Sequence, residues 1–167
     1  IMEVLQSRWI SMGEVTKKFE NNFKELHGVQ HSFAVTNGTA ALHLALRSLD
    51  IQPGDEVIVP SLTFVATINS VLYTGAKVVF ADIISTHNLT ISPEDIRSKL
   101  TAKTKAILVV HYAGYPCAMT EIMEIAKKNQ LKVIEDCAHS PLTQYKGASL
   151  GSWGNAGCFS FFANKNM

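Results

Sequence analysis

Strand-like and helix-like segments alternate along most of this chain, and the alternation restricts the folds it can adopt. Each strand-like segment is a short apolar run, and the helix-like segments carry boundary signals such as Ser92-Pro93 at a start and Gly75 at an end. The pattern predicts strands at 56–59, 77–83, 105–110 and 131–137, and helices at 63–75, 92–100 and 120–129. A helix between successive strands lets the next strand run in the same direction. We therefore expect an α/β fold with a mainly parallel sheet and helices on both faces.

The two ends of the chain depart from this rhythm. An amphipathic helix is predicted at 14–26, closed by Gly28, and a short strand, an Asn37-Gly38 turn and another helix follow it. At the other end, "YKGASLGSWGNAGCFSFF" contains two strand-like pieces separated by glycines rather than by a helix. We expect a hairpin-like closure that adds a strand of reversed direction, with Phe159 and Phe161 in a buried strand.

The composition excludes several classes of protein. Charged residues make up only 17% of the chain and hydrophobic ones 47%, so we expect a partner subunit or further chain to cover part of the surface. The net charge is +1 and no run is rich in Lys or Arg, which argues against nucleic-acid binding. No stretch reaches the roughly 18 apolar residues of a membrane span.

Three cysteines are present, Cys117, Cys137 and Cys158, and no pair shows C-x-x-C spacing. An odd number without that spacing argues against a disulfide framework and against a zinc site. We expect buried, reduced thiols in a cytoplasmic protein. The chain has no internal repeat or linker-like tract, which favours one compact domain.

The segment Asn37-Gly38-Thr39-Ala40 is the first candidate site. A glycine there allows close approach of the backbone, and the start of the following helix offers unpaired N–H groups and a positive dipole end to an anion such as phosphate. The alternative is an ordinary turn in which Thr39 caps the helix.

Asp136 is the second candidate, because ligands of open α/β sheets bind beyond the carboxyl ends of strands. An aspartate that ends an apolar strand can pair with a cation, bind a metal or cap the next segment, and Asp82 occupies a similar position one unit earlier. No second acid or histidine recurs at ligand spacing around Asp136, so we expect no metal site there.

Lys165, with Ser160 five residues before it, is the third candidate. Partial burial of an amine at the mouth of an apolar strand suits it to form an imine with a carbonyl, whereas the alternative is a solvated loop lysine. A phosphate-binding helix start, a carboxylate able to hold a pyridinium and a reactive amine are together the parts of a pyridoxal 5'-phosphate (PLP) site.

Five ordered segments carry a resemblance to a known family. They are "NGTAALHLAL", "GDEVIVPSLTFVATINSVLYTGAKVVFADI", "AILVVHYAGYPCAM", "VIEDCAHS" and "GCFSFFANKNM". In this order and spacing the chain resembles the DegT-type (DegT/DnrJ/StrS) sugar aminotransferases, PLP enzymes with the aspartate-aminotransferase (type I) fold. The similarity extends over almost all of the 167 residues.

The resemblance implies roles for individual residues. Lys165 matches the lysine that attaches PLP and carries a proton in catalysis, and Asp136 matches the aspartate that pairs with the pyridine nitrogen. The phosphate-binding turn is matched by Gly38, Thr39 and Ala40, and the serine that contacts the same phosphate by Ser160. Phe64 matches the aromatic residue that stacks on the cofactor ring, and His139 matches a position against the cofactor that is often glutamine in relatives.

The resemblance also implies an activity, which is transfer of an amino group from an amino acid such as glutamate to a nucleotide-linked keto-deoxysugar. The alternatives are a non-catalytic PLP-binding protein and a sugar dehydratase of the same family, although relatives of the latter kind replace the lysine by histidine. A homodimer is implied, and residues 1–167 are expected to be the N-terminal part of the PLP-binding large domain, without the small C-terminal domain.

Overall fold

The computed structural model describes residues 1–165, which fall into two compact units, residues 1–34 and residues 35–165. The first unit contains helices α1 (Met2–Ser7) and α2 (Glu14–His27). Helix α2 ends as predicted, because Gly28 adopts left-handed φ/ψ of 65°/33° and its N–H donates to the carbonyls of Lys24 and Glu25. The short strand predicted before Asn37 does not form, and residues 31–35 are coil.

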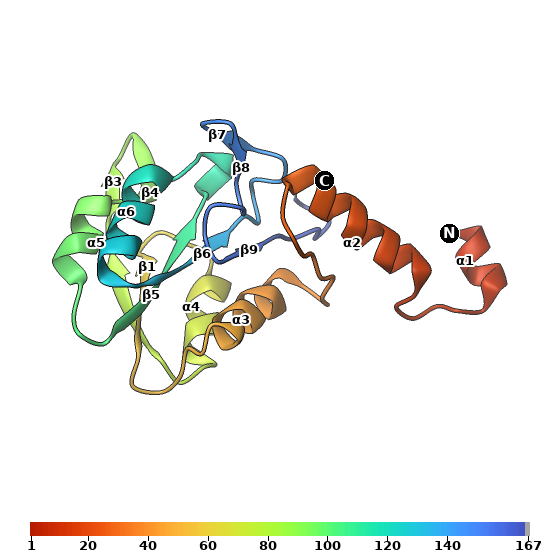
Figure 1. Ribbon diagram of the computed structural model, residues 1–167, viewed down its shortest axis with the longest axis horizontal. Helices are drawn as coiled ribbons and strands as arrows, with labels where there is room; N and C mark the ends of the chain where they lie inside the picture. Colours follow the sequence, from red (N-terminus) through yellow and green to blue (C-terminus); the bar gives the residue numbers. More distant parts are fainter. Residues whose placement is uncertain (166–167) are drawn as a thin grey trace. The chain divides into compact units, whose positions relative to one another are not determined.

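The second unit is built around a five-stranded sheet in the order β2-β1-β5-β6-β9 (Figure 1). Its strands are β1 (Glu56–Pro60), β2 (Lys77–Ala81), β5 (Thr104–Val110), β6 (Lys132–Asp136) and β9 (Ala156–Cys158). All four pairings in this sheet are parallel, which confirms the predicted mainly parallel α/β fold.

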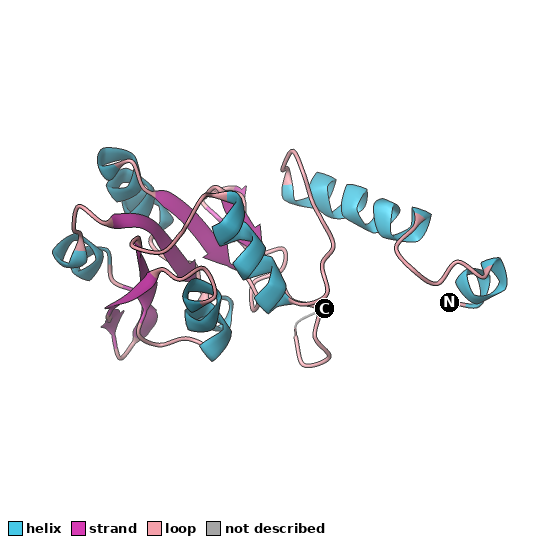
Figure 2. Cartoon of the chain, turned by 90° about the horizontal axis from the view of Figure 1, so that it is seen from below, coloured by secondary structure: helices cyan, strands magenta, loops and turns pink. Residues whose placement is uncertain are grey.

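Helices cover both faces of the sheet, with α3 and α4 on one face and α5 and α6 on the other (Figures 1 and 2). Their bounds are α3 (Gly38–Ser48), α4 (Val65–Leu72), α5 (Pro93–Lys99) and α6 (Met119–Asn129). Strand side chains alternate between two cores, so that Ile107 and Val109 of β5 face α5 and α6 whereas Leu108 faces α3 and α4. Helix α5 begins as predicted, since the Ser92 hydroxyl accepts the Asp95 N–H and Pro93 is the first helical residue.

The last strand of the sheet corrects the sequence prediction. Strand β9 runs parallel to β6, not in the reversed direction, because residues 137–155 return the chain to the start of β6. There Asn155 pairs with Val133 in both directions, its N–H donating to the Val133 carbonyl and its side-chain oxygen accepting the Val133 N–H. The only antiparallel pairings among the described residues are two small ribbons, β3 (Ile83–Ser85) with β4 (Asn88–Ile91) and β7 (Gln144–Tyr145) with β8 (Ala148–Ser149).

The predicted buried strand through Phe159 and Phe161 is also wrong. Strand β9 is an edge strand, and it ends at Cys158, opposite the end of β6 at Asp136. Phe159 packs on the core that faces α5 and α6, whereas Phe161 is 45% exposed. The three cysteines are free and buried, as predicted.

Glu135 holds the loop that leads into β9. Its buried carboxylate accepts the N–H groups of Gly151, Trp153 and Gly154, each at 2.8 Å, and its Oε2 lies 3.1 Å from His111 Nε2. The His111 Nδ1 accepts the Cys117 N–H, so the neutral ring carries its proton on Nε2 and donates it to Glu135. The carboxylate is therefore surrounded by donors.

We predict that Glu135→Gln lowers the free energy of unfolding by about 2–3 kcal/mol, because the amide NH2 would face backbone donors in a buried site and leave them unsatisfied. Urea denaturation of the whole protein measures the loss. Glu124→Gln on the exposed face of α6 is the matched control and should change stability by less than about 0.5 kcal/mol. Equal stabilities for the two variants would contradict the anchoring role of Glu135.

Candidate functional site

The carboxyl ends of the parallel strands bring the predicted site residues to one edge of the sheet. Asp136 is the last residue of β6, and Ser160 follows β9 by two residues. Since Asp136 is paired with Val110 of β5 on one side and Cys158 of β9 on the other, the segments after these strands begin next to one another. This is the edge at which open α/β sheets bind ligands.

Asp136 is a buried carboxylate with a donor on each oxygen. It is 6% exposed, its Oδ1 accepts the Ala138 N–H at 3.1 Å, and its Oδ2 accepts the Thr67 hydroxyl at 2.9 Å. Burial raises the pKa of this carboxyl, while the two hydrogen bonds and the nearby His139 act in the opposite direction. A carboxylate kept in a low-dielectric site interacts strongly with any cationic group placed against it.

Thr67 connects Asp136 to the start of α4. The Thr63 hydroxyl donates to Thr67 Oγ1 at 2.8 Å, and Thr67 donates in turn to Asp136. Phe64 lies between these two threonines at the N-cap of α4, and its side chain is 71% exposed. The same turn therefore orients the carboxylate and presents an aromatic ring. Sequence reasoning missed Thr67, because a threonine inside an apolar helix does not by itself indicate a partner in a distant strand.

The start of α3 lies against Ser160. A Cβ built on Gly38 would lie 3.3 Å from the Ser160 Cβ and 3.5 Å from the Phe159 carbonyl oxygen, so the absence of a side chain permits the close approach. The N–H groups of Gly38 and Thr39, in the first turn, have no intrahelical acceptor. Together with the Ser160 hydroxyl they offer donors to an anion.

The capping residue of this helix differs from the one considered in the sequence analysis. The cap is Asn37 rather than Thr39, because the Asn37 Oδ1 accepts the Ala40 N–H at 2.8 Å. That hydrogen bond occupies the Ala40 N–H, so the first turn leaves the N–H groups of Gly38 and Thr39 as donors for an anion. The signal for Asn37 was in the sequence, since asparagine is a preferred N-cap residue.

Lys165 and His139 are in contact. The Lys165 Nζ lies 3.2 Å from His139 Nε2, and the His139 Nδ1 accepts the Ala113 N–H at 3.3 Å. Ala113 belongs to the short helix η1 (Tyr112–Gly114), which follows β5. The amine thus lies beside the segments that follow β5 and β6.

Two other acidic groups have structural roles. Asp82 Oδ1 accepts the Ile83 N–H at 2.8 Å, and the Asp82 N–H donates to Asp95 Oδ2, so Asp82 shapes the connection to β3.

His111, Glu135 and Cys137 place potential metal ligands within 4.8 Å of one another. Burial raises the pKa of the Cys137 thiol well above its usual value, and both oxygens of Glu135 already accept hydrogen bonds. We therefore interpret these three side chains as part of a hydrogen-bonded network.

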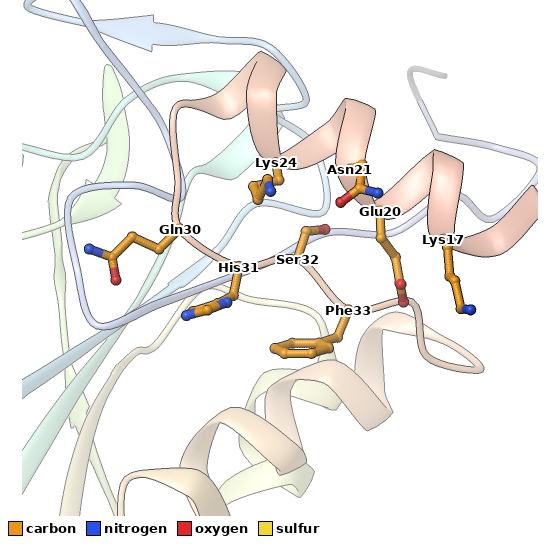
Figure 3. A pocket seen from close by; sticks show the side chains of 8 residues that line it. All are labelled: Lys17, Glu20, Asn21, Lys24, Gln30, His31, Ser32 and Phe33. Carbon is orange, nitrogen blue, oxygen red and sulfur yellow. The ribbon is translucent and has the colours of Figure 1, made fainter. Parts of the chain in front are cut away.

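A separate polar hollow of about 260 Å3 lies in the N-terminal unit, between α2 and the segment after it (Figure 3). Lys17 and Lys24 line it together with Glu20, whose Oε1 accepts the Ala34 N–H at 2.7 Å. None of the predicted site residues lines this hollow. Among the described residues, no helix is long and apolar enough to cross a membrane.

Comparisons with known proteins identify relatives of this chain. The chain is 49% identical to GDP-perosamine synthase from Escherichia coli O157:H7 over 168 residues, which cover 100% of this chain and 46% of that protein. The chain thus spans less than half the length of the curated relative it matches.

Solved structures share the fold. The aminotransferase from Psychrobacter cryohalolentis superposes with a TM-score of 0.94 at 46% identity, covering 99% of this chain and 42% of that chain. A Streptococcus pneumoniae protein in its PLP form superposes with a TM-score of 0.95 at 30% identity, covering 99% of this chain and 46% of that chain. The architecture is therefore that of the type I PLP-dependent aminotransferases. The model of the DegT/DnrJ/EryC1/StrS aminotransferase family matches residues 1–167, and the chain belongs to that family.

Proposed function

We propose that this chain binds PLP at the carboxyl edge of its sheet, and that the whole protein transfers an amino group from an amino acid such as glutamate to a nucleotide-linked keto-deoxysugar. The observation that carries the proposal is the convergence of Asp136, the start of α3 with Ser160, and Lys165 at that edge. Family membership supports the reaction class. The name of GDP-perosamine synthase, which specifies a GDP-linked product, supports the substrate class.

The residues of this edge fit PLP. The first turn of α3 and Ser160 would offer donors to the phosphate, at a point where Gly38 leaves the room that a Cβ would fill. Asp136 would offer a buried carboxylate to the pyridine nitrogen, and Phe64 would offer an exposed aromatic side chain to the ring. Lys165 supplies the amine for covalent attachment.

When bound, PLP supplies the electron sink that stabilises negative charge on the substrate carbon. Asp136 contributes by keeping a proton on the ring nitrogen, since a buried carboxylate with two donors of its own favours a cation beside it. Phe64 covers one face of the site. Lys165 would carry the proton between the substrate carbon and the exocyclic carbon of the cofactor, once its amine is free.

The wider assembly is part of the proposal. We infer that residues 1–167 correspond to the first part of the PLP-binding large domain of the relatives, and that the whole protein is a cytoplasmic homodimer. Many side chains that are apolar and exposed here are consistent with further cover, among them Phe33, Phe64 and Tyr115, each more than two-thirds exposed. Formation of 2-oxoglutarate from glutamate in the presence of a nucleotide-linked keto-sugar tests the reaction, and failure of the PLP-loaded whole protein with every such sugar and donor would contradict it.

The first test is Lys165→Ala, which should abolish covalent PLP attachment and change the free energy of unfolding by less than about 1 kcal/mol, since a partly exposed lysine contributes little to stability. Borohydride reduction followed by peptide mass mapping locates the pyridoxyl label. Lys128→Ala on α6 is the control and should keep the label. A label on another lysine of the unaltered protein would overturn the assignment.

Asp136→Asn should lower the transamination rate at least a hundredfold, because a neutral amide does not hold the pyridinium proton. The free energy of unfolding should increase in the same variant. Burial raises the pKa of Asp136, so its charge costs stability once the pH rises through that pKa, and the cost is absent below about pH 3.9, the unfolded value. In urea denaturation of the PLP-free whole protein, the Asn variant should therefore gain stability relative to the unaltered protein between pH 4 and pH 7.5. A relative loss over this range would show that the charge stabilises the fold.

Thr67→Val should reduce kcat/KM about tenfold, because it removes one hydrogen bond of about 1.5 kcal/mol to a charged carboxylate while keeping the side-chain shape. Thr67→Ser retains the hydroxyl and should stay within about twofold of the unaltered protein. Steady-state kinetics with matched PLP loading distinguish the two variants. If Ser and Val reduce the rate equally, the methyl group and not the hydrogen bond carries the effect.

A further inference from the structure

The contact between His139 and Lys165 has a direction that the neighbouring backbone determines. The His139 Nδ1 lies 3.3 Å from the Ala113 nitrogen, which donates to it, and the Nε2 lies 3.2 Å from the Lys165 amine. A backbone N–H can only donate, so Nδ1 must be the acceptor of that bond. A neutral imidazole has one donor and one acceptor nitrogen, and the proton is therefore on Nε2.

This tautomer limits what Lys165 can do. The Nε2–H can only donate, and an ammonium group has three donors and no acceptor, so a hydrogen bond between the two forms only when the lysine is an unprotonated amine whose lone pair accepts. The amine in that state is the nucleophilic form.

The surroundings hold the ring in this orientation. Ala113 has left-handed φ/ψ of 52°/23°, which aims its N–H at His139, and the Tyr112 ring packs edge-on to the imidazole at 6.2 Å. Among the described residues, Asp136 at the end of β6 and Tyr112 from η1 are titratable neighbours of the pair, whereas His111 is directed to Glu135.

We propose that His139 is a positioning residue for Lys165, and that its Nε2–H holds the unprotonated amine with its lone pair available to the PLP aldehyde. The inference rests on the proposed function. In the step that it serves, the lysine nitrogen forms a bond to the aldehyde carbon, and the aldehyde oxygen leaves as water with both amine protons. No oxidant or reductant is required.

The position of the proton is measured by 15N NMR of the PLP-free whole protein labelled with [15N]histidine. The resonances lost in His139→Gln identify the ring, and we expect a protonated Nε2 and an unprotonated Nδ1. A protonated Nδ1, alone or together with a protonated Nε2, would overturn the proposal, because neither form reconciles the Ala113 contact with donation to a neutral amine.

A second measurement follows the rate of PLP capture by the PLP-free protein. His139→Gln keeps one acceptor for Ala113 and one donor for Lys165, and should capture PLP within about twofold of the unaltered rate. His139→Leu keeps the bulk without either group and should be about fivefold slower at pH 7, the effect of one ordinary hydrogen bond. The deficit should shrink as the pH approaches 10, because more of the lysine is then unprotonated without help.

A purely structural role for His139 would slow capture equally at all pH values, and that result, like an unaltered rate in the Leu variant, would contradict the proposal. Peptide mapping distinguishes failure of the role proposed for His139 from failure of the proposed function. A pyridoxyl label on Lys165 together with a protonated Nδ1 defeats only the role of His139. A label elsewhere defeats the proposed function itself.

Discussion

Strand β6 is paired in parallel on both sides, with Val110 of β5 opposite Asp136 on one side and Cys158 of β9 opposite Asp136 on the other. This register determines which chain segments meet at the carboxyl edge of the sheet. Three chain segments begin at the same edge of the sheet: the one that follows β5 with His111 and Ala113, the one that follows β6 with His139, and the one that follows β9 with Ser160 and Lys165. A shift of one residue in either pairing would send Asp136 to the opposite face.

The alternation of side chains along β6 separates two acidic residues into different roles. Glu135 and Asp136 are adjacent in sequence and both are buried, yet their side chains face opposite sides of the sheet. Glu135 meets donors on both of its oxygens and holds the loop that leads into β9. Asp136 receives one donor on each oxygen, and burial raises its pKa. A cation bound beside it would therefore stabilise the charged carboxylate.

Much of the fold was predictable from local signals. Apolar runs identified strands β1, β2, β5 and β6, and Gly28 and Ser92 marked helix boundaries because each acts through its own backbone neighbours. The direction of β9 was not predictable, since it depends on the path of residues 137–155 and on the pairing of Asn155 with Val133. The apolar run after Cys158 resembled a strand, but strand formation also requires a paired neighbour.

Some residues of the candidate site were likewise predictable from the sequence, and others were not. Asp136 and Lys165 could be proposed from their positions after apolar segments, and Gly38 from the turn that precedes a helix. Thr67 could not, because a threonine in an apolar helix does not by itself indicate a partner 69 residues further along the chain. The tautomer of His139 was equally inaccessible, since it depends on a backbone N–H from the turn after another strand.

We propose that one edge of this sheet holds the cofactor through the first turn of α3, Ser160 and Asp136. A crystal structure of the whole protein with PLP would show the contacts of the cofactor. We expect the phosphate at the N–H groups of Gly38 and Thr39 and the Ser160 hydroxyl, with the pyridine nitrogen against the Asp136 carboxylate. A phosphate bound away from α3, or a pyridine nitrogen with no contact to Asp136, would contradict it.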